Sequence, residues 1–459
     1  MTTHAAKPTD AEQTADTAAP GAASAPPRLD EVLLDRTDPD FLAGAYQTYA
    51  QIRAAGPVVR VRHCPFLRDD DAQTQAQRGE QPLREILFVS RYEQVAEALV
   101  DSRLSSDPFV LLPSEVRATL PTPPEPFRLF SRSLIMCDPP DHSRLRKLVQ
   151  PSFSAKALDA LRPRIQRLTD QLLDQAEHQA AERGELAPER RMDLIQAFAY
   201  PLPVAVISDL LGIPDEDREV VRRWSAFRMD SRSPAVIAET TRQFEQFSAY
   251  LRGLFARKRQ APADDMISQM IHAQEDGDRL SEDELLSMIF LLYLAGHVTT
   301  VNLIGNGVFA LLDHPEQLAR LRAEPQLVHG LVEETLRYYA PIDYFGSPRV
   351  ATCDLDLGGV AIPKGAPVAV GLAAANRDPQ RFAEPDRFDI ARPDAHRHLA
   401  FGRGIHLCLG APLARIEGEI AFSTLIRRLP GLRLAVPADR IRWTGASGTR
   451  GLRELPVCF

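Results

Sequence analysis

The chain has 459 residues, of which 44% are hydrophobic and 25% are charged, and its formal net charge is −8. This composition is that of a globular protein large enough to bury a cofactor, and the acidic balance excludes a typical nucleic-acid binder, which carries a basic face toward phosphates. The five cysteines stand without close pairs, which excludes a disulfide framework and a CxxC site and indicates a protein of the reducing cytoplasm.

The N-terminal part begins with 28 residues that are rich in Ala, Thr and Pro and lack an apolar stretch that could serve as a signal peptide. We expect these residues to form a disordered tail and residues 29–459 to form one domain. Helical spacing follows over 39–55, and GPVVRVRH and REILFVS then show the pattern of two paired strands. The polar segment between them, 66–83, is long for a hairpin and predicts a surface loop insert.

Beyond these strands the sequence becomes helical. A helix is expected over 91–101 and an irregular, proline-rich stretch over 102–136. Spacing near 3.6 residues or a helix-favouring composition then covers 141–150, 155–183, 193–211, 215–229, 236–258, 281–313 and 325–340. Strand character returns only in TCDLDLGG, VAIPKGAPVAVG and LRLAVP. The predicted fold class is therefore mainly α with small β-sheets, an α+β fold.

The run from Leu285 to Leu312 carries no formal charge and is long enough to cross a bilayer. The polar side chains of His297, Thr299 and Asn302 make it a poor membrane span, because such groups are costly in hydrocarbon. We therefore expect a long helix buried in the centre of the domain, and no membrane partner.

The segment HLAFGRGIHLCLGAPLARIEGEIAF surrounds Cys408 with residues that suit a sulfur anion. Gly402 and Gly404 permit a tight turn that could aim backbone N–H groups at the sulfur. Residues 411–425 look helical, which places Cys408 near a helix N-terminus, where the positive end of the dipole favours thiolate over thiol. The other four cysteines lack these surroundings and are interpreted as small hydrophobic residues.

Three neighbours of Cys408 have the features expected around a flat ligand that carries an anionic group. Gly410 lets such a ligand approach the chain closely, Phe401 can cover the sulfur with apolar surface, and His406 can donate to the anionic group. A thiolate-bound iron porphyrin accounts for all of these features. The alternative, a zinc ion held by His406 and Cys408, needs further ligands, and the sequence has no companion CxxC or HxxxH.

The string FGRGIHLCLG resembles the Phe-Gly-x-Gly-x-x-x-Cys-x-Gly signature of the cytochrome P450 family. The resemblance extends over about residues 35 to 458 and implies the fold of that family, with a long central helix over the haem. It implies haem b (iron protoporphyrin IX) as the cofactor and Cys408 as its axial iron ligand. Phe401, Gly402 and Gly410 would then lie beside the haem.

A second string resembles the buried charge network of this family. In VEETLRYYAP, Glu334 and Arg337 lie three residues apart and share a helix face. Alone, such a pair is common and is more often solvated. Together with Arg387 of EPDRFDIARP it resembles the family's Glu-Arg-Arg triad, which implies a structural role for all three residues.

A third string resembles the segment that holds the haem propionates. In DPPDHSRLRKLVQPSFS, His142 and Arg146 lie four residues apart on an expected helix and could both reach one carboxylate. The alternative is an ordinary basic helix face. The resemblance places Arg349 of SPRVA in the same group, and with His406 it implies four cationic or donor groups for two carboxylates.

The helix that contains LLYLAGHVTTVNLIGNG is expected to face the bound oxygen. Ala295, Gly296 and Thr299 stand three and four residues apart, so we place them on one face, against a flat cofactor. A Thr299 hydroxyl there could support proton delivery, whereas a mid-helix threonine otherwise bonds to its own i−4 carbonyl. AGHVTT resembles the family's Ala-Gly-x-Asp/Glu-Thr-Thr motif but has Val298 at the acidic position.

The departure at Val298 leaves three explanations open. His297, water or a substrate group replaces the missing carboxylate in the proton relay, or the enzyme couples electrons poorly, or its chemistry needs less proton delivery than hydroxylation does. His297 is the titratable candidate, because its ordinary pKa suits a relay, although a packed core histidine is an equal alternative.

The family's reaction inserts one atom of dioxygen into an organic substrate. The sequence has no dinucleotide or flavin fingerprint, so a ferredoxin and its reductase are the expected partners of a monomeric enzyme. Their candidate contacts are Arg144, Lys147, Arg403 and Arg415. The alternatives are an atypical oxidation (coupling, desaturation or a peroxide-driven reaction) and a haem protein that binds ligands without turnover.

The expected substrate is an apolar small molecule of secondary metabolism, possibly bound to a carrier protein, as in actinobacterial members of the family. Aromatic and apolar residues in the segments that would face the cofactor indicate a largely apolar pocket with Asp343 as a polar contact. The pocket residues that we predict are Phe109, Phe130, Ile342, Asp343 and Tyr344.

Overall fold

The computed structural model describes residues 23–36, 38–64, 84–120, 123–224, 233–274, 277–344, 347–445 and 448–459. The loop insert predicted over 66–83 and residues 1–22 of the predicted tail lie outside the described residues. The predicted tail boundary at residue 28 is too late. Ser24 already pairs with Val360 in a β-bridge, and a strand begins at Arg28.

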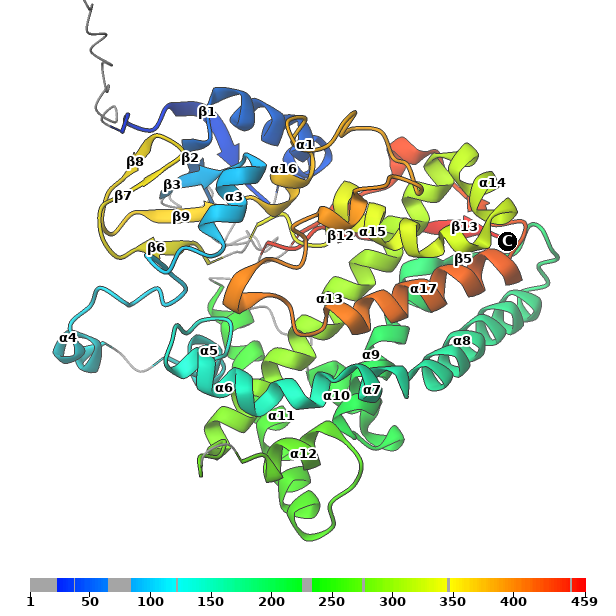
Figure 1. Cartoon of the computed structure of the whole chain (residues 1–459). Coiled ribbons are helices and arrows are strands. Elements are labelled where there is room, and N and C mark those ends of the chain that lie inside the picture. Colours follow the sequence, from blue (N-terminus) through cyan, green and yellow to red (C-terminus); the bar gives the residue numbers. More distant parts are fainter. Residues whose placement is uncertain are drawn as a thin grey trace, which may run out of the picture.

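The N-terminal part forms a six-stranded sheet with helices packed against it (Figure 1, blue to cyan with yellow strands). Its strand order is β1 (Arg28–Leu34), β2 (Val58–His63), β3 (Arg84–Val89), β9 (Pro367–Val370), β6 (Arg349–Ala351) and β4 (Leu104–Ser105). The predicted pairing of the two early strands is confirmed, because β2 and β3 are antiparallel, with Val58 opposite Val89. The associated helices are α1 (Pro39–Ala55), α3 (Tyr92–Ala98) and α16 (Leu372–Asn376).

Helices form the rest of the molecule, as the sequence predicts (Figure 1). They are α6 (Asp141–Val149), α7 (Ala155–Asp159), α8 (Arg162–Glu182), α9 (Pro201–Leu211), α10 (Arg218–Trp224), α11 (Pro234–Gln260), α12 (Met266–His272), α13 (Glu282–Asp313), α14 (Pro315–Ala323), α15 (Val328–Tyr338) and α17 (Ala411–Arg428). The small sheets comprise β5 (Arg191–Asp193) with β10 (Arg433–Leu434) and β13 (Pro456–Cys458), β7 (Leu355–Leu357) with β8 (Val360–Ile362), and β11 (Trp443–Thr444) with β12 (Gly451–Leu452).

Proline explains most differences from the predicted helices. The stretch 102–136 is not wholly irregular, because α4 (Ser114–Thr119) and α5 (Glu125–Ser131) each begin directly after a proline. The helix predicted over 155–183 is interrupted between α7 and α8. Pro163, near the start of α8, lacks the backbone N–H that a continuous helix would need for its hydrogen bonds. A π-helical turn, Ile195–Ala199, likewise precedes Pro201 and α9.

The long apolar helix α13 runs through the middle of the helical part (Figure 1). Ser281 caps its N-terminus together with Glu284 in a capping box, and the helix packs against α5, α9, α15, α17 and β12. By length and composition alone it could cross a membrane, because an 18-residue window of the helix has a mean hydropathy of 1.6. However, 67% of that window is buried inside the structure. As predicted, α13 is a core helix of this fold.

Candidate active site

The loop before α17 holds Cys408 through backbone geometry. Gly402 and Gly404 have φ angles of 70° and 75°, a left-handed conformation that other residues rarely adopt. The backbone N–H of Cys408 donates to the carbonyl of Phe401 at 3.0 Å, which closes the loop. Because α17 begins at Ala411, the sulfur lies at the N-terminal end of that helix.

The sulfur of Cys408 has a mixed electrostatic environment. Desolvation raises the pKa of the thiol, whereas hydrogen bonds from the backbone N–H groups of Gly410 and Ala411 and the nearby charges of Arg146 and Arg415 lower it. The net pKa lies above the ordinary value. The residue is nevertheless accessible, because it opens onto a hollow of about 450 Å³ between α6, the loop and α17. A positive ion bonded to the sulfur would favour the thiolate.

Two histidines from distant segments meet beside this loop. The rings of His142 on α6 and His406 lie 4.4 Å apart, edge to face. The Nε2 atom of His406 lies 3.1 Å from the hydroxyl of Ser106. His142 is 1% exposed, and neither of its ring nitrogens has a hydrogen-bond partner among the described residues. A buried imidazole without a partner is unusual, because the unmet hydrogen bonds are costly.

Two arginines complete this cationic group. The Arg146 guanidinium donates to the carbonyls of Ile405 (2.8 Å) and Leu407 (2.9 Å). Arg349 donates to the carbonyls of Ala98 and Leu99. Burial lowers the pKa of both arginines.

The cationic group lacks matching negative charge. Burial lowers the pKa of His406 to about 4, and the charges of His142, Arg349 and Arg146 add to this effect, while Asp138 opposes it. Asp138 itself is engaged by the backbone N–H of Ser106 and the hydroxyl of Ser105. The group therefore suits a ligand that brings its own carboxylates, as haem does with its two propionates.

One face of α13 opens in the middle of a helix that is otherwise buried. Ala295 is exposed, and Val298 and Thr299 are half-buried, although residues 285–291 and 300–311 on either side of them are buried. The Thr299 hydroxyl donates to the carbonyl of Ala295 at 2.7 Å, which is the local bond that a mid-helix threonine usually makes. Its oxygen keeps lone pairs that can accept a further hydrogen bond.

Gly296, predicted on the cofactor face, packs toward α9, and His297 is the packed core histidine that was one of its two predicted roles. A Cβ on Gly296 would lie 3.2 Å from Ile207 of α9, so this glycine permits helix packing. His297 is 4% exposed and packs against the rings of Tyr200 and Tyr293. Its Nδ1 contacts the carbonyl of Tyr293 at 2.6 Å, and burial lowers its pKa. The structure does not bring His297 together with Thr299.

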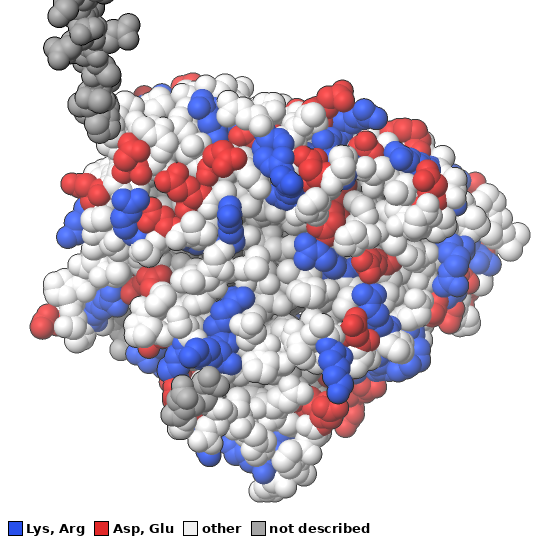
Figure 2. All heavy atoms as spheres, in the orientation of Figure 1, with Lys and Arg blue, Asp and Glu red and all other residues white. Residues whose placement is uncertain are grey.

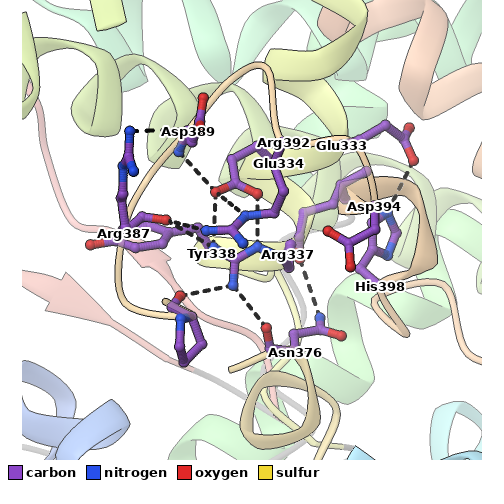
Figure 3. A network of polar contacts seen from close by, with 12 residues as sticks. Glu333, Glu334, Arg337, Tyr338, Asn376, Arg387, Asp389, Arg392, Asp394 and His398 are labelled. Atoms are coloured by element: carbon purple, nitrogen blue, oxygen red, sulfur yellow. Dashed lines mark hydrogen bonds and ion pairs between the residues drawn. The ribbon is translucent and has the colours of Figure 1, made fainter. Parts of the chain in front are cut away.

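The predicted charge network is present, but its third residue is different (Figure 3). Arg337 donates through Nε and Nη2 to the two oxygens of Glu334, at 2.7 and 2.8 Å, and both side chains are fully buried. The second arginine at Glu334 is Arg392, whose Nε lies 3.2 Å from Oε1. Arg387 contributes only its carbonyl, while its side chain is 59% exposed and contacts Glu384 and Asp389. Both arginines belong to EPDRFDIARP, so the motif alone did not distinguish them.

Two predicted pocket residues belong to the core instead. Asp343 is fully buried, accepts from Tyr49 at 2.9 Å and pairs with Arg36 at 3.2 Å. Tyr344 is 1% exposed, and its ring lies 4.5 Å from the Arg36 guanidinium. Both side chains therefore contact residues that lie some 300 positions earlier in the chain.

The other predicted pocket residues are not gathered into one wall. Phe109 is 42% exposed just before α4, which stands away from the body of the molecule (Figure 1). Phe130 is half-buried and packs edge to face on Phe290, at 6.4 Å. Ile342 pairs with Thr449 in a β-bridge.

The predicted contact residues for a redox partner differ in their availability. Lys147 and Arg403 are exposed. Arg144 is paired with Asp278 and Glu284, and Arg415 with Glu333. Figure 2 shows acidic and basic residues interspersed over the face that it presents, so no single-sign surface stands out there.

Sequence reasoning missed two residues next to the loop, Glu333 and His398. Glu333 directly precedes Glu334 in the motif, and His398 opens the cysteine segment, so proximity to two recognised strings was the available signal. In the structure, His398 Nε2 lies 3.4 Å from Glu333 (Figure 3).

Comparisons with known proteins agree with this geometry. The family model described as Cytochrome P450 matches residues 203–430. The cytochrome P450 monooxygenase PikC of Streptomyces venezuelae is 40% identical over 438 residues, which cover 95% of each chain. The 6-deoxyerythronolide B hydroxylase of Saccharopolyspora erythraea is 39% identical over 429 residues, 92% of this chain and 98% of the relative.

A solved structure also superimposes on nearly the whole chain. It is P450BioI in complex with an acyl carrier protein that carries hexadec-9Z-enoic acid. The TM-score is 0.75 at 36% identity, and the match covers 92% of this chain and 99% of that one.

Proposed function

The chain belongs to the cytochrome P450 family of monooxygenases, and from this premise we propose that it binds haem b through Cys408 and oxidises an apolar small molecule of secondary metabolism. The observation that carries the proposal is the combination of two neighbouring features, with Cys408 and Arg146 lining one hollow. Cys408 receives backbone N–H groups from a helix N-terminus, and a cationic group beside it has a buried histidine without a partner.

The residues on the sulfur side fit the haem. Cys408 supplies the thiolate, which the N–H groups of Gly410 and Ala411 and the apolar ring of Phe401 surround. His142, Arg146, Arg349 and His406 would bind the propionate carboxylates through charge-assisted hydrogen bonds. When bound, haem supplies one-electron redox chemistry and the activation of dioxygen.

On α13, Thr299 is the residue that handles the proton. Its hydroxyl donates to the Ala295 carbonyl, so its lone pairs can accept a proton-bearing partner on the open face. Val298 has no proton to give, and His297 packs on another face. We therefore assign the relay to ordered water or to a polar group of the substrate.

The relatives support a natural-product substrate. One of them is named for hydroxylation of 6-deoxyerythronolide B, and one solved neighbour holds an acyl chain on its carrier protein. Ferredoxin and its reductase are the electron donors that we propose. An atypical oxidation on the same haem is the second candidate, favoured by Val298, because a peroxide-driven reaction brings its protons with the peroxide and does not depend on a carboxylate relay.

The test is the absorption spectrum of the reduced, carbon-monoxide-treated holoprotein. The wild type should show the far-red-shifted Soret band of sulfur ligation. C408H should keep haem but lose this band, whereas C353S, at an exposed cysteine outside the site, should retain it. A folded, haem-loaded wild type without the shifted band would overturn the proposal.

Turnover separates the two candidate functions. With ferredoxin and its reductase, the hydroxylated product should form with close to two electrons consumed for each molecule of product. Product without an added oxygen atom would support the atypical oxidation instead.

A further inference from the structure

Glu333 of α15 precedes Glu334 in the chain but has charged partners of its own. Its carboxylate accepts two hydrogen bonds from Arg415 of α17, at 2.6 and 3.1 Å. The Nε2 atom of His398 lies 3.4 Å from the same carboxylate (Figure 3). The side chain of Glu333 is only 3% exposed, so this is a buried anion with two fixed partners.

Both partners of Glu333 contact Phe401. The Arg415 guanidinium lies 4.7 Å from the centre of the Phe401 ring, and the His398 ring lies 5.6 Å from it. The Phe401 carbonyl in turn accepts the backbone N–H of Cys408. Phe401, His398, Arg415 and Cys408 all line the same hollow. A continuous series of contacts therefore runs from Glu333 through Arg415 and Phe401 to the cysteine.

The partners of Glu333 favour its ionised form. Burial alone raises the pKa of Glu333, but its contacts with His398 and Arg415 outweigh burial and lower the pKa to about 2. His398 Nδ1 accepts the backbone N–H of Ala400 at 3.1 Å, which places its proton on Nε2, toward Glu333. Glu333 is therefore an anion that holds one cation, Arg415, with the His398 ring close by.

We infer that Glu333 is a positioning residue for the haem sulfur, because it holds the Arg415 cation against Phe401, next to Cys408. The inference rests on the proposed haem-thiolate function. A guanidinium held over an aromatic ring keeps its charge and the ring in one place. Arg415 is still 30% exposed, so without Glu333 its side chain can turn into solvent, where water screens its charge.

A cation held near the sulfur favours the added electron of the ferrous state. The reduction potential of the haem therefore reports the position of Arg415. A purely structural ion pair, which would only join α15 to α17, predicts a change in stability and no dependence of the Arg415 effect on Glu333.

The test is a cycle of four haem-loaded proteins: wild type, E333Q, R415Q and the double variant, compared by spectroelectrochemical titration. R415Q alone should lower the potential, with a fall of about threefold to tenfold in the ferrous-to-ferric ratio, where tenfold is 59 mV. In the E333Q background, R415Q should have no further effect, because Arg415 has already left Phe401. Equal shifts in both backgrounds would overturn the inference.

The charge-matched control is E419Q, on the same helix as Arg415. Glu419 pairs with Arg162 and His329, and the potential should not move. If E333Q fails to fold, Glu333→Asp takes its place, because a shorter carboxylate does not reach both Arg415 and His398. All variants should keep the shifted carbon-monoxide band. Loss of that band in the wild type would refute the proposed function, whereas an additive cycle with the band intact would refute only the inference.

Discussion

The Glu334 network and the cationic group around His142 are both buried clusters of charge, but only the first is complete. Arg337 uses all five of its N–H bonds, on Glu334 and on the carbonyls of Asn376, Pro385 and Arg387. The cationic group contains a histidine with no partner among the described residues and has too little nearby negative charge. A complete network can only stabilise the fold, whereas an incomplete one can bind a ligand.

The largest effect should come from breaking the complete network. E334Q leaves the buried Arg337 and Arg392 without their anion, which should lower the free energy of unfolding by about 3–5 kcal/mol. Urea denaturation of the apoprotein measures this. R392Q should cost about 1–3 kcal/mol, because it removes the hydrogen bond to the buried Glu334 together with three to backbone carbonyls at the edge of the network.

R387Q is the matched control for this comparison. The Arg387 side chain is 59% exposed, so its loss should change stability by no more than about 0.5 kcal/mol. If R387Q were as harmful as R392Q, the assignment of Arg392 to the network would be wrong.

Glu417 on α17 sharpens the comparison, because it is a buried carboxyl with no cation beside it among the described residues. It is 2% exposed, and burial raises its pKa to about 8. Its pKa in the folded protein is above that in the unfolded chain, so the folded state holds the proton more tightly. The contribution of Glu417 to stability is then greatest below pH 4.5, the ordinary value, and is lost as pH rises toward 8.

The measurement compares wild type and E417Q in urea at pH 5 and pH 8. The wild type should lose about 3 kcal/mol more than E417Q does between these two values. Parallel pH profiles of the two proteins would show that Glu417 is already ionised or paired in the folded state.

The site was predictable where the chemistry lies in one continuous string, and less so elsewhere. Gly402, Gly404 and Cys408 form the expected turn because their conformation depends on local φ angles and on the helix that follows. Arg392 could not be preferred to Arg387 from sequence, because both lie in one loop and only tertiary packing decides which reaches Glu334.

The predicted pocket shows the same limit more strongly. Asp343 and Tyr344 follow a segment that was correctly expected to be helical, but their side chains turn toward Arg36 and Tyr49, which arrive from the N-terminal part of the chain. No local pattern encodes such a partner. The short helices α4 and α5 were missed for a different reason, because prolines that usually break helices here precede their first residues.

The smallest of these effects tests the incomplete cluster. H142F keeps the shape of a ring that is 1% exposed and removes two nitrogens that have no partner among the described residues. The apoprotein should therefore be as stable as the wild type or slightly more stable, because replacing an unsatisfied polar group with an apolar one of similar shape removes a desolvation cost. Haem binding should weaken by about 10- to 30-fold, the loss of roughly 1.5–2 kcal/mol from one hydrogen bond to a charged carboxylate.

Haem titration and apoprotein unfolding, measured on the same preparations, separate the effect of H142F on haem affinity from its effect on stability. If H142F destabilised the apoprotein by more than about 1 kcal/mol with unchanged haem affinity, His142 would be part of the core and the cluster would not be a ligand site.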